Sequence, residues 1–271
     1  MSGNLDGRVA LVLGGGSVGE GWSNGQASAA LLADQGAAVV VADRDEGAAL
    51  RACSLIGERG GTSMPLLCDV GASARLIEAI REAHGWQGRL DVVLLNVGLS
   101  GSGPGLDAYD ETEWDRVFGI NVRAAFTVCR TVVPLMRAQG FGRIITVSSI
   151  AGMGSIGRNP NHAYATSKAA LMALTRSVSV EIAQYGITAN CVVPGMIDTP
   201  HASEAIRRKR PPEEAEAMLA QRAAIVPTNS QGSPWDIARA VAFLASPDNG
   251  YVNGIELVVD GGIVNLMPPM A

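Results

Sequence analysis

Tyr164 and Lys168 are the residues of this 271-residue sequence whose types and spacing best suit proton transfer. They open a long helical pattern, and a four-residue step places their side chains one turn apart on the same helix face. An ammonium held close to a phenol favours the phenolate and lowers the pKa of the phenol. We therefore predict that Tyr164 can exchange a proton with a substrate oxygen. A helix could also carry this pair without any chemical role.

A glycine-rich segment near the N-terminus is the first element that could position such chemistry. It follows a short apolar run at residues 8–13, typical of a buried parallel strand, and precedes a helical pattern. In this context glycines let the backbone approach a pyrophosphate, and the helix N-terminus offers it free N–H groups. A merely flexible turn is the alternative. The candidate contacts are Gly14, Gly16, Ser17, Gly19, Gly21, Ser23, Asn24 and Gly25.

Acidic residues end the next two apolar runs. Asp43 ends the second run, where a carboxylate can accept both ribose hydroxyls of an adenosine and would repel a 2′-phosphate. This favours NAD over NADP, although the neighbouring Arg44 could instead pair with a phosphate. The third run ends in Asp69 and Val70. Asp69 could accept from the adenine amino group or serve equally well as a helix N-cap.

Later apolar runs alternate with helical patterns and predict further strands. Their exits carry Asn96, Val97 and Gly98, then Ser148 and Ser149, then Pro194 and Gly195. One long helix is expected at residues 111–139, with a buried Asn121 that needs partners. The pattern predicts an α/β fold, a Rossmann-type doubly wound parallel sheet of about seven strands flanked by helices on both faces. We expect one domain over residues 1–271, with an excursion over the cleft at about 199–233.

Composition limits the classes of function. The net charge is -5 without a basic stripe, so nucleic acid is not expected as a partner. No apolar run approaches the ~20 residues of a membrane span, and the N-terminus does not resemble a secretion signal. The four cysteines and three histidines lack metal-like spacing. We therefore predict a cytoplasmic protein without a metal site and with reduced thiols.

The motifs above, in this order, resemble those of the short-chain dehydrogenases/reductases over nearly the whole chain. Besides the glycine loop and the strand exits, the likeness rests on Asn121, on Tyr164 with Lys168, on Ile197 and Thr199 after Pro194 and Gly195, and on residues 258–262. The length matches the compact branch of the family. The glycine loop is longer than usual, Leu95 stands where the family has Asn, and the segment between Ser149 and Tyr164 is extended.

The resemblance implies an NAD(P)-dependent oxidoreductase that transfers hydride between a nicotinamide and a secondary alcohol or ketone. Tyr164 would be the acid/base, Lys168 would lower its pKa and hold the nicotinamide ribose, and Ser149 would hydrogen-bond the substrate oxygen, with Ser148 as the alternative. Asn121 would position a water behind Lys168. Four residues would hold the nicotinamide carboxamide: Pro194, Gly195, Ile197 and Thr199. The adenosine side would be lined by Asn96, Val97 and Gly98.

The identity of the substrate is the least determined feature. The candidate contacts are Ser149, Met153, Arg158, His162 and Met196. Arg158 or the basic cluster at residues 207–210 could pair with an anionic substrate, but the cluster could equally be a solvated helix face. The family likeness implies a homotetramer or homodimer. Two other functions stay open: an NAD-binding regulatory protein without turnover, and a dehydratase or isomerase on the same scaffold.

Overall fold

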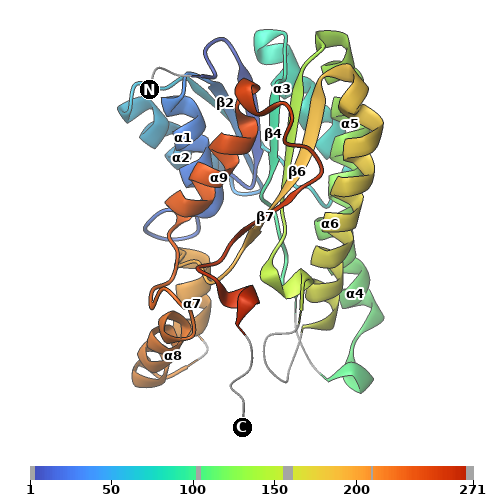
Figure 1. Cartoon of the computed structure of the whole chain (residues 1–271). Coiled ribbons are helices and arrows are strands. Elements are labelled where there is room, and N and C mark those ends of the chain that lie inside the picture. Colours follow the sequence, from blue (N-terminus) through green and yellow to red (C-terminus); the bar gives the residue numbers. More distant parts are fainter. Residues whose placement is uncertain (1–3, 102–104, 155–160, 209, 267–271) are drawn as a thin grey trace.

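A seven-stranded, all-parallel sheet forms the centre of the computed structural model, which describes residues 4–101, 105–154, 161–208 and 210–266 (Figure 1). The strand order is β3-β2-β1-β4-β5-β6-β7. The strands are β1 (Val9–Leu13), β2 (Ala38–Asp43), β3 (Ser63–Leu67), β4 (Val92–Leu95), β5 (Gly142–Val147), β6 (Ile187–Pro194) and β7 (Glu256–Val259). The predicted Rossmann-type sheet is thereby confirmed.

The strand order reverses between β1 and β4. β1 pairs with β2 on one side and with β4 on the other, so the chain leaves the two strands in opposite directions across the sheet. In open parallel sheets, ligands bind in the crevice that opens at the carboxyl ends of the strands at such a reversal. The glycine loop after β1 and the exits of β4 and β5 meet at this edge.

Helices cover both faces of the sheet (Figure 1). One face carries α1 (Asn24–Asp34), α2 (Glu46–Glu58) and α9 (Pro234–Ala245), and the other carries α3 (Ser73–Gln87), α5 (Ala124–Gln139) and α6 (His162–Ile182). α1 packs directly on α9, and the buried side chains between them are mostly small, including Ala29, Ala30 and Ala33. Alanine combines high helix propensity with this close approach. None of the described helices is long and apolar enough to cross a membrane.

The helix expected at residues 111–139 contains a π-helical turn in the structure. α4 (Glu111–Phe118) runs into a π-helical turn at Gly119–Arg123, and α5 follows. The expected helix is thus present over its full length, and the π-turn within it was not predicted. The wide turn contains Asn121, which is buried, and π-turns occur frequently at functional sites.

The predicted excursion at 199–233 contains two helices, α7 (Pro200–Arg208) and α8 (Pro212–Ala224). α7 starts shortly after the carboxyl end of β6, at the edge of the sheet where the crevice opens, and both helices lie at the foot of the molecule in Figure 1.

Candidate active site

The glycine loop is closed by hydrogen bonds of its own residues. The Ser17 hydroxyl donates to the Gly21 carbonyl at 3.1 Å, and the Ser23 hydroxyl donates to the Gly16 carbonyl at 2.7 Å. Ser23 also caps α1 by accepting from the backbone N–H of Gln26. The sequence left two roles open for both hydroxyls, contact with a phosphate or hydrogen bonding to the backbone. In the structure they take the second role and hold the extended loop in shape.

The start of α1 nevertheless suits a pyrophosphate. A Cβ on Gly25 would overlap the Gly14 carbonyl, so only glycine allows this close packing of the loop. Within the described residues, no acceptor meets the backbone N–H groups of Asn24 or Gly25. An anion at this position would receive free N–H groups and the positive end of the helix dipole. The residues present therefore fit the phosphates of a dinucleotide.

Asp43 faces the glycine loop from the end of β2. One carboxylate oxygen accepts from the Gly16 N–H at 3.0 Å, and the other accepts from the Asp45 N–H at 3.1 Å. Each oxygen retains a further lone pair, so the carboxylate can still accept ribose hydroxyls. Arg44 is exposed and forms no ion pair within the described part of the chain.

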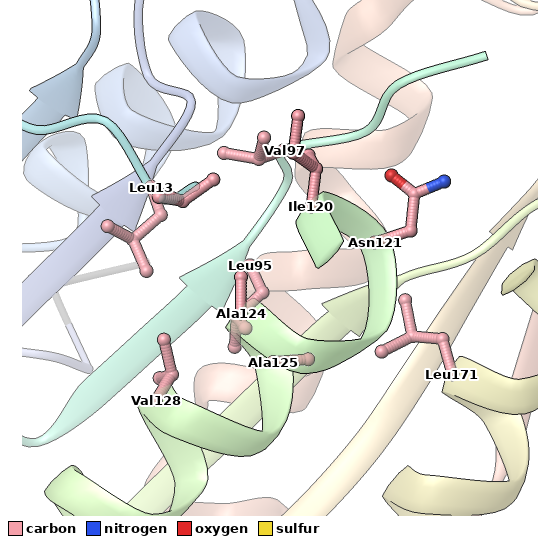
Figure 2. A pocket seen from close by; sticks show the side chains of 10 residues that line it. Leu13, Leu95, Val97, Ile120, Asn121, Ala124, Ala125, Val128 and Leu171 are labelled. Carbon is pink, nitrogen blue, oxygen red and sulfur yellow. The ribbon is translucent and has the colours of Figure 1, made fainter. Parts of the chain in front are cut away.

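Asp69 does not cap a helix. Its carboxylate accepts from the Gly71 N–H at 2.9 Å within a turn, and the N-cap of α3 is Ala72. The N-cap alternative for Asp69 was therefore wrong. Its neighbour Val70 lines a narrow apolar cavity of about 10 Å³ together with Leu13, Leu95 and Val97. Figure 2 shows this cavity beside the ends of β1 and β4.

The exit of β4 is tied both to the glycine loop and to Lys168. The Asn96 amide donates to the Gly14 carbonyl at 2.9 Å. A Cβ on Gly98 would lie 3.1 Å from the Lys168 Nζ, so any side chain at this position would crowd the ammonium. Gly98 therefore lies beside the lysine.

Ser149, Tyr164 and Lys168 come together at the carboxyl end of β5. Ser149 is the N-cap of the short turn Ile150–Gly152, and the Ser149 hydroxyl forms a hydrogen bond with Tyr164. The Lys168 Nζ lies 5.6 Å from the centre of the Tyr164 ring. The buried Ser148 hydroxyl donates to the Lys168 carbonyl at 2.8 Å and so holds α6 in place. Of the two serines, Ser149 is therefore the one beside the phenol.

The protonation of this cluster differs from the sequence prediction. Burial raises the pKa of Tyr164, and the hydrogen bond from Ser149 only partly offsets this effect. Burial also lowers the pKa of Lys168 to about 8, and its Nζ donates to the Val147 carbonyl at 2.8 Å. The prediction that Lys168 brings the phenol below its usual pKa does not hold in this structure, because desolvation of the buried phenol has the largest effect on its pKa.

Asn121 supports the cluster from the π-turn. Its side-chain oxygen accepts from the Leu99 N–H at 2.8 Å, and its amide donates to the Leu99 carbonyl and to the Ser167 hydroxyl, both at 2.9 Å. The Ser167 hydroxyl in turn donates to the Tyr164 carbonyl at 2.8 Å. These contacts satisfy the buried amide and connect it to the backbone of the tyrosine. The sequence did not identify Ser167.

Asn161 is a second residue that sequence reasoning missed. It is the N-cap of α6, and its side-chain oxygen accepts from the Tyr164 N–H at 3.2 Å and from the Tyr109 hydroxyl at 3.3 Å. Its amide donates to the Ser100 carbonyl. An Asn directly before a helical pattern is a recognisable N-cap signal. The predicted contact His162 packs edge-on against Tyr109, with 6.4 Å between ring centres.

The segment after β6 crosses to the loop before α9. The Gly195 N–H donates to the Val259 carbonyl at 2.9 Å, Ile197 is buried in a bridge with Gly232, and the Met196 carbonyl accepts from the Gly232 N–H. The Thr199 hydroxyl caps the start of α7.

The other proposed substrate contacts are less confined. Met153 is half exposed, and Arg158 lies outside the described residues. Arg207 in the basic cluster forms an exposed ion pair with Glu216 at 3.0 Å. This contact favours the interpretation of the cluster as a solvated helix face. No group of His, Cys, Asp and Glu within the described ranges could hold a metal ion.

α7 touches the tip of the extended glycine loop. A Cβ on Gly19, which has a φ of +78°, would overlap the Glu204 carboxylate. A Cβ on Gly21 would lie 3.4 Å from the Pro200 side chain. The extra loop residues therefore extend across the crevice as far as α7.

Comparisons with known proteins identify the family of this chain. A family model described as Enoyl-(Acyl carrier protein) reductase matches residues 19–264. The (2S)-[(R)-hydroxy(phenyl)methyl]succinyl-CoA dehydrogenase subunit BbsD of Thauera aromatica is 33% identical over 258 residues, covering 95% of this chain and 97% of the relative. The chain belongs to the short-chain dehydrogenase/reductase family. It is therefore an oxidoreductase that acts on CH–OH groups with a nicotinamide dinucleotide.

Two further short-chain dehydrogenases/reductases resemble this chain. Cyclopentanol dehydrogenase of a Comamonas species is 35% identical over 262 residues, which cover 96% of this chain and 98% of the relative. A solved structure of 7α-hydroxysteroid dehydrogenase, complexed with NADH and 7-oxo glycochenodeoxycholic acid, superposes with a TM-score of 0.84 at 31% identity. The aligned region covers 95% of this chain and 94% of the solved chain.

Proposed function

We propose that this protein interconverts a secondary alcohol and a ketone, with Tyr164 as the acid/base and NAD as the preferred cofactor. The observation that carries the proposal is the cluster of Ser149, Tyr164 and Lys168 beside the glycine loop, at the edge of the sheet where a dinucleotide fits. We propose further that residues 1–271 act as one domain and that residues 199–233 cover the substrate.

The protein handles the proton in this reaction. A nicotinamide bound in the crevice supplies the hydride chemistry. In oxidation, the Tyr164 hydroxyl oxygen, as phenolate, accepts the proton of the substrate alcohol, while Ser149 hydrogen-bonds the same substrate oxygen. Lys168, when protonated, stabilises the phenolate across the 5.6 Å to the ring. In reduction, Tyr164 returns the proton. The contacts of Ser148, Ser167 and Asn161 to the backbone of α6 keep the phenol in position.

The preference for NAD follows from Asp43. Its carboxylate stands beside the glycine loop, accepts from the Gly16 N–H, and has lone pairs left for two ribose hydroxyls. A 2′-phosphate at the same position would meet a like charge. Arg44 does not neutralise Asp43 within the described residues, so repulsion of NADP is the expected result.

We propose that the substrate carries an apolar body. The Trp114 and Phe118 rings stack at 4.9 Å, and Tyr109 packs edge-on against Trp114 at 6.2 Å and reaches the N-cap of Tyr164's helix. These rings give the region before α6 an aromatic wall. Among the relatives named above, cyclopentanol dehydrogenase is named for an alcohol on an apolar ring.

A screen of secondary alcohols with NAD, followed by the absorbance of the reduced nicotinamide, tests the proposal. Tyr164→Phe should lower turnover by ~10²–10⁴-fold, because a positioned acid/base contributes about that much. Dinucleotide binding, measured by fluorescence, should change little. Ser149→Ala should also lose turnover, whereas Ser148→Ala is the matched control and should lose much less. Full activity in Tyr164→Phe would refute the assignment of the acid/base.

We also propose that the protein is a cytoplasmic homotetramer or homodimer. The described structure contains four free cysteines and leaves Phe126 of α5 and Val180 of α6 exposed on the outer surface. Free thiols fit a reducing compartment, and exposed large apolar side chains on neighbouring helices fit burial between subunits.

A further inference from the structure

A basic pocket lies at the edge of the sheet opposite the active site. It has a volume of about 360 Å³ and lies where β1, β5 and β6 begin. Its lining includes Arg8, Phe141, Arg143, Thr188, Pro247 and Asn253. Ser149 follows the far end of β5, so this pocket is separate from the crevice described above.

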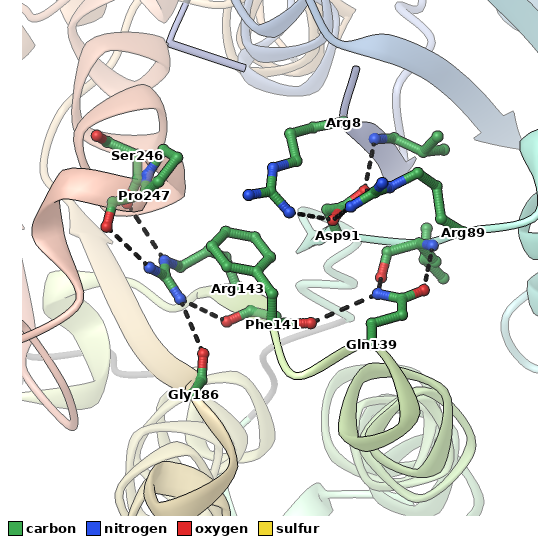
Figure 3. Close-up of polar contacts among 12 residues, drawn as sticks. Arg8, Arg89, Asp91, Gln139, Phe141, Arg143, Gly186, Ser246 and Pro247 are labelled. Carbon is green, nitrogen blue, oxygen red and sulfur yellow. Dashed lines mark hydrogen bonds and ion pairs between the residues drawn. The ribbon is translucent and has the colours of Figure 1, made fainter. Parts of the chain in front are cut away.

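Arg143 is buried in this region without a carboxylate partner. Only 3% of the residue is exposed. Its guanidinium donates to four backbone carbonyls, those of Gly142, Gly186, Ser246 and Pro247, at 2.9–3.3 Å (Figure 3). Two of these carbonyls follow the C-terminus of α9, whose dipole favours a cation. Four of the five guanidinium N–H groups of Arg143 thus donate to these carbonyls, and one has no acceptor among the described residues.

Arg8 adds a second cation beside the first. Its guanidinium lies 3.9 Å from the centre of the Phe141 ring, and that of Arg143 lies 4.3 Å from the same centre. Arg8 donates to Asp91 through Nη1 at 2.9 Å and to no other acceptor within the described residues. Burial and the charge of Arg8 both lower the pKa of Arg143. Most of the N–H groups of Arg8 are thus free to meet a ligand.

The nearby carboxylates do not balance this charge. Asp91 is fully buried and also accepts two hydrogen bonds from Arg89, both at 2.7 Å, and one from the Val9 N–H (Figure 3). Two guanidiniums, those of Arg8 and Arg89, therefore share one carboxylate, and Arg143 pairs with backbone carbonyls alone. Asp248, which follows Pro247, accepts from the Asn4 amide and forms no ion pair with Arg8 or Arg143 in the described structure. The pocket consequently carries an excess of positive charge.

We infer that this pocket binds a phosphate group, either as free phosphate or as part of a small phosphate ester. Guanidinium groups match the oxygens of a phosphate with several donors at once, and such charge-assisted hydrogen bonds are stronger than neutral ones. The volume lies at the lower end of the range of about 300–1,000 Å³ that small-molecule sites occupy. The inference does not depend on the proposed reaction.

Titration with inorganic phosphate and with glycerol 3-phosphate tests the inference. The enzyme is first saturated with NAD, so that the glycine loop is occupied, and ionic strength is held constant with chloride. Isothermal titration calorimetry should show a single site for at least one of the two ligands. Tighter binding of glycerol 3-phosphate would identify an ester as the ligand, and equal or weaker binding would identify free phosphate.

Arg8→Gln should weaken phosphate binding by at least about tenfold, because it removes the guanidinium with free donors. Arg89→Gln is the matched control, since Arg89 pairs with the same Asp91 but does not line the pocket. It should retain binding within about twofold. Absence of binding to the wild type, unchanged binding in Arg8→Gln, or an equal loss in both variants would each overturn the inference. The thermal midpoint of each variant shows whether it is folded.

Discussion

Lys168→Met is expected to make the protein more stable at pH 7, although it removes a residue of the proposed catalytic cluster. Lys168 is 3% exposed, and burial lowers its pKa from 10.5 to about 8. A shift of this size corresponds to a penalty of about 3 kcal/mol on the charged side chain. The substitution also leaves the Val147 carbonyl without its donor, which costs about 1–3 kcal/mol. We expect a net gain of roughly 1 kcal/mol at pH 7.

The pH dependence makes this expectation specific. Between pH 8 and 10.5 the unfolded chain keeps the Lys168 proton that the folded chain has lost. The stability of the wild type therefore rises with pH across this window, and below it the penalty is constant. Lys168→Met lacks this contribution, so its advantage should be greatest at pH 8 and below and should disappear as the pH approaches 10.5.

Urea unfolding of both proteins at several pH values from 7 to 10 measures this difference. Lys168→Arg is the control, because its guanidinium stays charged throughout and should bring no gain at pH 7. A Met variant less stable than the wild type at pH 7, or a difference independent of pH, would refute the reasoning.

Three further outcomes are expected. Asp43→Asn should reduce the preference for NAD over NADP by at least about tenfold in kcat/KM, because repulsion between nearby like charges costs on the order of 1–4 kcal/mol; an unchanged ratio would contradict the role of the carboxylate. Gly19→Ala should lower the free energy of unfolding by about 1–2 kcal/mol, since alanine disfavours a φ of +78° and its Cβ would overlap Glu204. Gly57→Ala in α2 is the control, because the added Cβ meets no atom there and the thermal midpoint should not fall. Alcohol oxidation should rise with pH above neutrality and ketone reduction should fall, because the pKa of Tyr164 is raised and oxidation needs its phenolate; a flat kcat/KM profile for oxidation would argue against this base.

The sheet and most of its helices could be predicted from the sequence, because their signals are local. Each buried parallel strand is a continuous apolar run, as residues 8–13 show, and each run ends in a glycine or polar segment. Tyr164 and Lys168 could be paired because helical spacing alone brings them to one face. Ser149 could be placed because a strand that ends at the crevice delivers the residues that follow it.

The sequence could not predict features that depend on contacts between distant segments. Nothing local distinguishes a π-turn at Asn121 from an ordinary helix, since the turn is stabilised by hydrogen bonds to Leu99 and Ser167. The pKa of Tyr164 depends on desolvation by the whole fold, which spacing does not report. The network of Arg8, Asp91 and Arg143 joins strand beginnings far apart in the chain, where each arginine looks like an ordinary surface cation.

The contact of Glu204 and Pro200 with the glycine-loop tip has a consequence for the order of events in turnover. We propose that α7 covers a ligand that lies along the loop, and that α7 moves outward when the ligand enters or leaves. Release of the dinucleotide should then require this movement and should be slower than in a variant whose shorter loop does not reach α7. The longer loop would in this way favour retention of the cofactor over its rapid release.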